Sequence, residues 1–324
     1  MNVRALRTRV RPLFSKQLRG ELGRAATQIR TTNLKTRTRT PPHQRGRFTS
    51  MTVTAHRSED PELAEVHRPL QRFEQCRIFV HGSWADDTRT PFSDLDNLIL
   101  VDDSRLEAKD CHRLSVALAR VDLNMMRLDP LQHHGNWIIL ESDLEGLDES
   151  YLPLRVVEGA LCLKGSPEVR ARVSLASSSE RMRRNVVSLA EALRVFSEPR
   201  AMNLWNAKHL VSGLSLMPAY LHQVHGRRIS KRDALHADAV NAVLSGTAGQ
   251  AIAWATQARK HWGRQLEQAD FGEFAGKAAK LRSGPAIRKF AKRNSPKPTG
   301  GFVESLPTPE IAALISESLA HASS

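Results

Sequence analysis

The stretch that decides the fold is Arg77–Asp103, RIFVHGSWADDTRTPFSDLDNLILVDD. It contains two short apolar runs, 78–80 and 98–101, and each run predicts a buried strand. Gly82 follows the first run and lets the backbone turn sharply and approach a ligand closely. Ser83 can cap a short helix and offer its hydroxyl and amide groups to a phosphate. The stretch therefore predicts strand, tight turn, excursion and strand.

Two carboxylates stand at the start of the second predicted strand, because Asp94 and Asp96 precede its apolar run. Side chains at positions i and i+2 of a strand point to the same face, so these two project together. They repel each other unless a cation lies between them, and their oxygen atoms suit Mg²⁺ or Mn²⁺. A third carboxylate would complete a two-metal site, with the metals about 3.5–4 Å apart. A solvated, aspartate-rich turn is the alternative for this pair taken alone.

The combination of Gly82-Ser83, an eleven-residue spacing and Asp94-Leu95-Asp96 resembles the signature of the DNA-polymerase-beta-like nucleotidyltransferase superfamily. The resemblance covers about residues 65 to 165. It implies an α+β fold with a small mixed sheet and helices packed on it. It also implies a nucleoside triphosphate held by Gly82 and Ser83, Mg²⁺ or Mn²⁺ held by acidic side chains, and transfer of a nucleoside monophosphate.

The third acid of this family lies on a neighbouring strand, between apolar residues. Residues 121–126 (VDLNMM) predict such a strand, after a helix over about 104–119, and Asp122 is then the third catalytic and metal-binding acid. Asp129 is the rival candidate. Because Pro130 follows it, Asp129 fits a turn in which its carboxylate bonds the local backbone.

The remainder of this first domain has weaker signals. In Gln132-His133-His134-Gly135, adjacent histidines on a strand would face opposite ways, which favours a polar turn or pocket wall over a metal site. Residues 137–140 predict another strand, and 152–164 resemble the helix and edge strand that close minimal nucleotidyltransferase domains. Gly165-Ser166-Pro167 marks a boundary, which gives a nucleotidyltransferase domain over 51–166.

An all-helical domain is expected over 167–270. Met182, Val186, Leu189, Leu193 and Phe196 recur at helical spacing, which predicts an amphipathic helix. Lys208, on the next helix, is a candidate contact for a triphosphate. A solvated lysine on a helix surface is the more common interpretation of such a residue.

Two segments are strongly basic. Residues 1–50 hold 13 Lys/Arg and one acid, so they supply +12 of the net charge of +14 and leave +2 for the remainder. They are expected to be disordered: a nucleic-acid arm, an organellar presequence or translated upstream sequence before Met51. The last is favoured, because no helix caps or helical periodicity precede Met51. Residues 276–301 carry eight Lys/Arg and no acid, which indicates a flexible linker or an arm that attracts polynucleotide or triphosphate. A short terminal helix should follow within 271–324.

The whole chain limits the class of protein. It has 324 residues, three widely spaced cysteines without a CxxC motif, and no long apolar run, so we expect no zinc site, no disulfide framework and no membrane partner, in a cytoplasmic protein. The expected function is metal-dependent transfer of a nucleotide, with ATP as the expected donor, to an acceptor hydroxyl. The alternatives are an antitoxin-like or nucleotide-binding partner protein and an enzyme that modifies RNA ends. The acceptor (small molecule, protein or RNA) and the oligomeric state do not follow from the sequence.

Overall fold

The computed structural model describes residues 48–86, 88–106, 108–132, 134–147, 154–174, 178–227 and 229–323. Contacts divide the chain into two compact units. Among the residues described, unit 1 takes in the chain up to Arg89, residues 93–174 and 279–288, whereas unit 2 takes in 90–92, 178–278 and 289–323. The expectations for residues 1–47 and for His133 fall outside the described residues.

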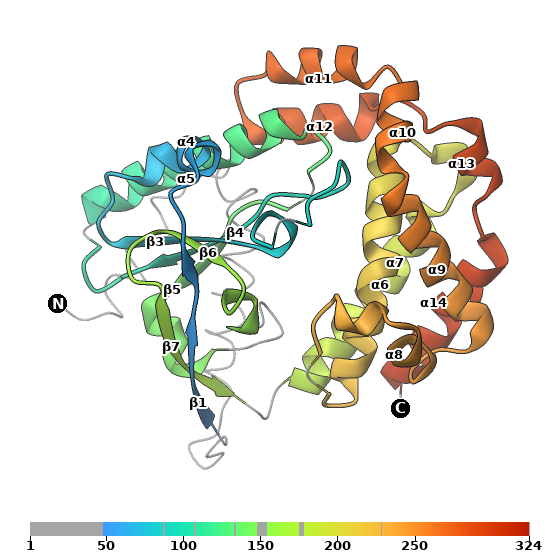
Figure 1. The fold of residues 1–324 in the computed structure, drawn as a ribbon, viewed down its shortest axis with the longest axis horizontal. Coiled ribbons are helices and arrows are strands. Elements are labelled where there is room, and N and C mark those ends of the chain that lie inside the picture. The colour runs from blue at the N-terminus through green and yellow to red at the C-terminus, as the bar shows by residue number, and fades with distance from the viewer. Residues whose placement is uncertain are drawn as a thin grey trace. The chain divides into compact units, whose positions relative to one another are not determined.

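Unit 1 is built on a five-stranded mixed sheet in the order β2-β6-β3-β4-β5. Figure 1 labels four of its strands, β3, β4, β5 and β6. The strands are β2 (His56–Arg57), β6 (Leu161–Lys164), β3 (Cys76–His81), β4 (Asp96–Val101) and β5 (Trp137–Leu140). β3 pairs antiparallel with β4 and β6, whereas β5 pairs parallel with β4 and β2 parallel with β6. The expected strands at 78–80, 98–101 and 137–140 are confirmed, and so is the small mixed sheet.

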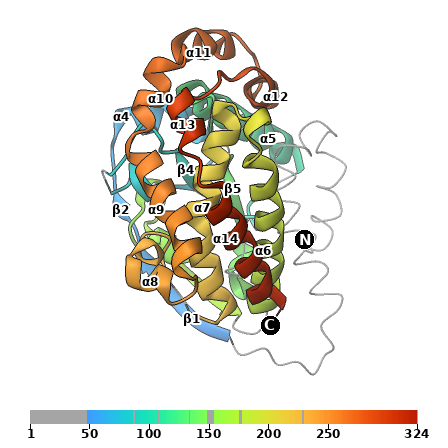
Figure 2. The same ribbon diagram turned by 90° about the vertical axis from the view of Figure 1, so that its right-hand side faces the viewer.

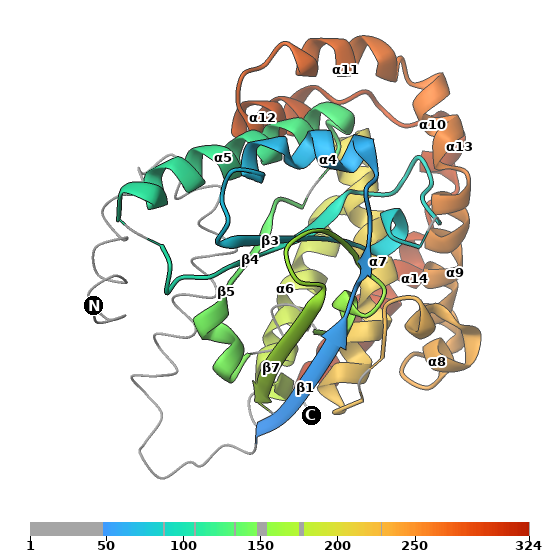
Figure 3. The same ribbon diagram turned by 60° about the vertical axis from the view of Figure 1, so that its left-hand side comes forward.

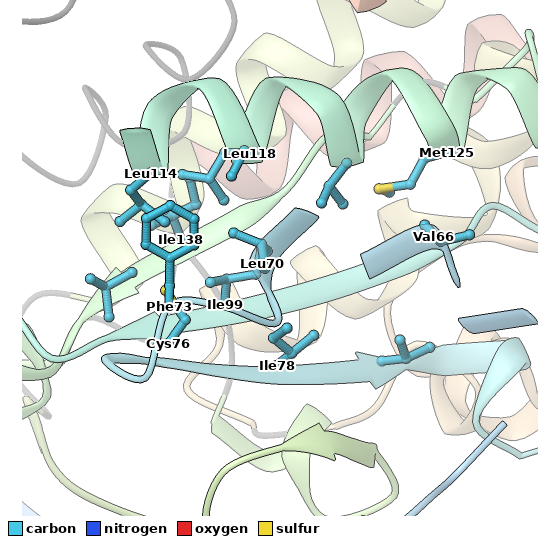
Figure 4. Close-up of a cluster of buried hydrophobic side chains, with 14 of the residues drawn as sticks. Val66, Leu70, Phe73, Cys76, Ile78, Ile99, Leu114, Leu118, Met125 and Ile138 are labelled. Carbon is cyan, nitrogen blue, oxygen red and sulfur yellow. The ribbon is translucent and has the colours of Figure 1, made fainter. Parts of the chain in front are cut away.

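One face of the sheet is covered by α4 (Pro61–His67) and α5 (Ala108–Leu128) (Figure 3). Asp60 caps α4 by accepting the amides of Glu62 and Leu63 at 2.8 and 3.0 Å, and Pro61 occupies its first turn. Leu114, Leu118 and Met125 point from α5 towards the sheet (Figure 4). There they join the buried side chains of Ile78, Ile99 and Ile138 in one apolar core.

A second apolar core lies on the other face of the sheet. Phe79, Leu98 and Leu100 alternate with the residues of the first core and pack with Val53 and Val169. Val53 belongs to β1 (Phe48–Thr54) and Val169 to β7 (Glu168–Ser174), which form a separate antiparallel two-stranded sheet. This alternation shows which face each residue of β3 and β4 occupies.

Two expectations for unit 1 were wrong. Residues 121–126 do not form a strand, because α5 continues to Leu128. Leu114, Leu118, Val121 and Met125 are all buried, and their 4-3-4 spacing is that of one helix face. The ordered domain also begins before Met51, since β1 starts at Phe48 and pairs with β7 from that residue onward.

Helices make up unit 2 (Figure 2), and the stripe expected from Met182 to Phe196 lies on its first helix. The helices are α6 (Ser178–Phe196), α7 (Leu204–Val224), α8 (Ala237–Asn241), α9 (Gly246–Lys260), α10 (Trp262–Gln268), α11 (Phe271–Ala279), α12 (Gly284–Asn294), α13 (Gly300–Glu304) and α14 (Thr308–Ser323), the first part of α12 belonging to unit 1. The flexible linker considered for 276–301 is therefore wrong, because α12 and α13 occupy much of it. No helix among the described residues is long and apolar enough to cross a membrane.

Short 3₁₀-helices connect many of these elements. They are η1 (Arg68–Leu70), η2 (Gly82–Trp84), η3 (Glu141–Gly146), η4 (Leu154–Val157), η5 (Pro199–Ala201) and η6 (Asp233–Leu235). Of these, η2 positions the candidate site, because it begins at the glycine that follows β3. The three cysteines are buried and free, so the described cysteines form no disulfide.

Candidate functional site

The Gly-Ser motif and the aspartate pair meet where β3 ends and β4 begins. His81, the last residue of β3, pairs with Asp96, the first residue of β4. The backbone then turns at Gly82 with a φ of +71°, a conformation that residues other than glycine rarely adopt. A Cβ atom at Gly82 would lie 3.5 Å from Oδ2 of Asp96. The fold thus brings together two motifs that lie eleven or more residues apart in the chain.

Gln132 fixes the backbone between the two aspartates. Leu95 donates its amide to Oε1 of Gln132 at 3.0 Å, and Nε2 of Gln132 donates to the Leu95 carbonyl at 2.8 Å. Leu95 itself is buried in the core beneath α5. Asp94 and Asp96, both half-buried, flank this fixed residue. Residues 132–135, for which a polar turn or a pocket wall was expected, therefore contribute Gln132, whose side chain holds the backbone of Leu95 like a clamp.

His81 is a polar residue of the site that the sequence analysis missed. Its side chain is only 9% exposed, and its Nε2 atom has no hydrogen-bond partner among the described residues. Burial lowers the pKa of His81, the charge of Asp96 raises it, and the charge of His134 lowers it. His81 stands directly before Gly82 at the end of a predicted strand. This position in the sequence indicates that His81 lies beside the Gly-Ser motif.

Asp122 lies on α5, on the opposite side of the sheet from Asp96. Its Oδ1 atom accepts the amide of Asn136 at 3.1 Å and the Asn136 side chain at 2.8 Å. The side-chain oxygen of Asn136 in turn accepts a hydrogen bond from Nδ2 of Asn97 at 2.8 Å. The same nitrogen of Asn97 lies 3.2 Å from the sulfur of Met125 on α5. Because Asn97 follows Asp96 on β4, the two side chains point to opposite faces. The structure therefore does not bring Asp122 to Asp94 and Asp96.

The surroundings of Asp122 belong to a buried polar network. Burial raises its pKa to about 6, against the lowering effects of the Arg288 charge and of the Asn136 amide. At the far end of the network, Nε2 of His67 lies 3.2 Å from Nδ2 of Asn97, and its Nδ1 lies 2.8 Å from the Leu63 carbonyl. Burial lowers the pKa of His67 to about 4, so its ring is neutral, with the proton on Nδ1. This network ties α4, α5, β4 and β5 together.

The rival acid, Asp129, behaves as the sequence predicts. It follows α5, and its Oδ1 atom accepts the amide of Leu131 at 2.8 Å. This is the local backbone bond expected of a residue before proline. Strand β5, the neighbour of β4, contains no acidic residue. Neither Asp129 nor β5 thus supplies a third acid beside Asp96.

The metal-binding capacity of the site follows from these placements. Among the described residues, no group of three or more His, Cys, Asp or Glu side chains has a metal-binding arrangement. Asp94 and Asp96 still offer the oxygen donors that Mg²⁺ prefers. Magnesium is commonly held by one or two carboxylates together with substrate phosphates and water. The pair therefore fits one ion that arrives with a phosphorylated ligand, and does not by itself fit a two-metal centre.

Lys208, on α7 of unit 2, is not the solvated residue that helix surfaces usually carry. Its side chain is fully buried, and its Nζ atom lies 5.6 Å from the ring centre of Phe92. The guanidinium of Arg259 lies 5.1 Å from the same ring, and Trp262 contacts it edge-on at 5.2 Å. Two cations thus approach one aromatic ring, an arrangement that stabilises unit 2.

Comparisons of the chain with protein-family models, curated proteins and solved structures gave no match.

Proposed function

We propose that the chain binds a magnesium–nucleoside triphosphate complex at Gly82, Ser83, Asp94 and Asp96 and transfers its nucleoside monophosphate to an acceptor hydroxyl. The resemblance to the nucleotidyltransferase superfamily suggests this reaction. The observation that supports it most directly is the position of Gly82, whose left-handed backbone lies beside the Asp96 carboxylate. A phosphate at this turn can approach the backbone without a side chain in the way, next to carboxylates that hold its cation.

Each residue of the site has a role in this proposal. Gly82 leaves space for the phosphates, and the hydroxyl of Ser83 donates a hydrogen bond to one of them. Asp94 and Asp96 hold the ion, which, when bound, neutralises charge on the phosphate oxygens. Gln132 keeps the two carboxylates in register through Leu95. The Nε2 atom of His81 is available to hydrogen-bond the ligand or the acceptor hydroxyl.

The position of Asp122 favours a second candidate function, in which the protein binds the nucleotide without turning it over. The resemblance assigns Asp122 the removal of a proton from the acceptor. On α5 its carboxylate instead bonds Asn136, on the face away from Asp96. A site with two acids is still sufficient for binding, since the phosphates and water complete the coordination of magnesium.

The test separates binding from turnover. Affinity for each of the four nucleoside triphosphates is measured by calorimetry with Mg²⁺ and, as a control, with a chelator. The protein is then incubated with α-phosphate-labelled triphosphate, Mg²⁺ and cell lysate, and labelled acceptors are identified. Metal-dependent binding with labelled product supports the transferase, whereas binding without product supports the second candidate. Absence of metal-dependent binding contradicts both.

A further inference from the structure

A cluster of unpaired cations lies along α12 and the residues after it, in unit 2. Lys289, Lys292 and Arg293 are exposed and are spaced at i, i+3 and i+4, so they share one face of the helix. Lys297, just beyond the helix, is also exposed. None of these four side chains forms a salt bridge with a described residue. We call these four residues the α12 basic face.

The charge of the α12 basic face is local. Residues 276–301 contain eight Lys/Arg and no acid, whereas the rest of the chain from Met51 onward carries a net negative charge. A run of cations without an acid, beside residues of net negative charge, creates a local positive potential. Unpaired and exposed cations keep that potential available to a polyanion.

The other side of α12 is already occupied. Ile287 and Ala291 are buried, and the ring of Phe290 stacks on Phe274 with centres 5.4 Å apart and planes 11° from parallel. Phe274 contacts Phe271 at 5.6 Å. A helix that binds a membrane surface inserts an exposed apolar face between lipids. Because α12 uses its apolar face for packing, its free face offers charge and no apolar surface of its own.

We propose that the α12 basic face binds the phosphate backbone of a single-stranded polynucleotide. The clustered cations match the repeating charge of such a chain, and Phe271 and Phe290 are only half-buried, so part of each ring stays accessible to a base. The α12 basic face contains no residue of the nucleotide site. Its binding to a polynucleotide is therefore independent of nucleotide transfer.

The test uses fluorescence anisotropy of a labelled single-stranded RNA, in a chelator and without triphosphate, over a series of salt concentrations. The full-length protein is compared with the variant K289Q/K292Q/R293Q and with a matched control, R184Q/R194Q/R200Q, which removes three exposed arginines of unit 2. The cations of residues 1–50 are common to all three proteins. They therefore cannot produce a difference between the variants.

The α12 variant should bind the RNA at least tenfold more weakly at moderate salt. Log affinity falls as log salt concentration rises, and each lost phosphate contact makes this fall shallower by about 0.7 for a single strand. Three lost contacts make it shallower by about 2. The matched control should change neither quantity. Equal loss in both variants, or an unchanged slope in the α12 variant, overturns the proposal, as does binding to anionic lipid vesicles without binding to RNA. Single-stranded DNA in a parallel series shows whether the 2′-hydroxyl contributes.

Circular dichroism confirms that the α12 variant is folded. Its affinity for magnesium–triphosphate is measured alongside and should equal that of the unchanged protein. Loss of RNA binding with normal triphosphate binding supports the α12 proposal by itself. Normal RNA binding by the folded α12 variant would contradict this proposal, whatever the affinity of that variant for magnesium–triphosphate.

Discussion

The side chain of Gln132 satisfies both backbone hydrogen-bonding groups of Leu95, at 3.0 and 2.8 Å. Gln132 is 1% exposed and Leu95 is 2% exposed, so water cannot replace these bonds. An amide side chain thus imitates a neighbouring strand at the point where β4 has not yet begun. This single clamp positions the backbone that carries Asp94 and Asp96.

Gln132→Leu tests the clamp. It leaves a buried amide and a buried carbonyl without partners, which costs about 1–3 kcal/mol for each group. We expect the free energy of unfolding, measured with urea, to fall by about 3 kcal/mol and the affinity for magnesium–triphosphate to fall with it. Gln71→Leu, at an exposed position, is the control and should change neither. Normal nucleotide affinity in a folded Gln132→Leu protein would show that the clamp does not position the site.

Asp94→Asn and Asp96→Asn test the carboxylate pair. Each removes one anionic ligand, so metal-dependent triphosphate binding should weaken more than tenfold and any turnover should be abolished. Without metal, the unfolding free energy should stay equal or rise, because one of two repelling charges is gone. Calorimetry and urea unfolding measure the two effects, with the exposed Glu191→Gln as control. Full metal-dependent activity in either variant would remove the pair from the proposed site.

The sequence predicts the β3–β4 pair well because the determining signals are local. Apolar runs, Gly82 and the Asp-Leu-Asp spacing lie within one short stretch, and the structure places them together. The helix predicted from the sequence ended near residue 119, too early for α5, because Val121, Leu123 and Met125 are apolar at alternate positions, as in a strand. The same segment also continues the 4-3-4 spacing from Leu114, and packing against the sheet decides between the two periods.

Other features depend on contacts that are distant in sequence. The clamp joins Gln132 to Leu95, 37 residues away, and no local pattern at either residue indicates it. The pairing of β1 with β7 joins Phe48 to Ser174. Local composition placed the domain start at Met51 because the residues before it are basic. The strand partner that orders residues 48–50 lies more than a hundred residues later.

The strand β1 predicts a difference between two truncated proteins. A variant without residues 1–47 keeps all seven cross-strand pairs of β1 and β7, whereas a variant without residues 1–50 loses the first three. The second also loses the contact in which the Arg172 guanidinium lies 5.1 Å from the Phe48 ring centre. Cross-strand pairs contribute about 0.2–1 kcal/mol each. We expect the shorter protein to melt about 4 °C lower by calorimetry.

The matched truncation is the control for this experiment. Removing residues 1–47 leaves β1 intact, so this truncated protein should melt at the same temperature as the full-length protein. Equal melting temperatures of the two truncated proteins would show that the first pairs of β1 contribute nothing measurable to stability.

The buried carboxyl of Asp122 predicts how stability depends on pH. Burial raises its pKa to about 6 in the folded protein, above the value near 4 of an unfolded chain. Between these two values Asp122 binds more protons in the folded state than in the unfolded state, so the contribution of Asp122 to stability decreases as pH rises from about 4 to 6 and then becomes constant. Two pKa units correspond to about 3 kcal/mol.

Asp122→Asn removes this dependence while keeping an oxygen that accepts from Asn136. We expect the decrease in unfolding free energy between pH 4 and 6, measured with urea, to be smaller by about 3 kcal/mol. Arg288→Met should act in the opposite direction, because Arg288 lowers the pKa of Asp122 and its loss extends the decrease to higher pH. Metal-dependent triphosphate binding should be unchanged in Asp122→Asn, since this carboxylate lies on the other face of the sheet from Asp96. An unchanged pH dependence combined with a loss of nucleotide binding would instead return Asp122 to the metal site and require α5 to present it there.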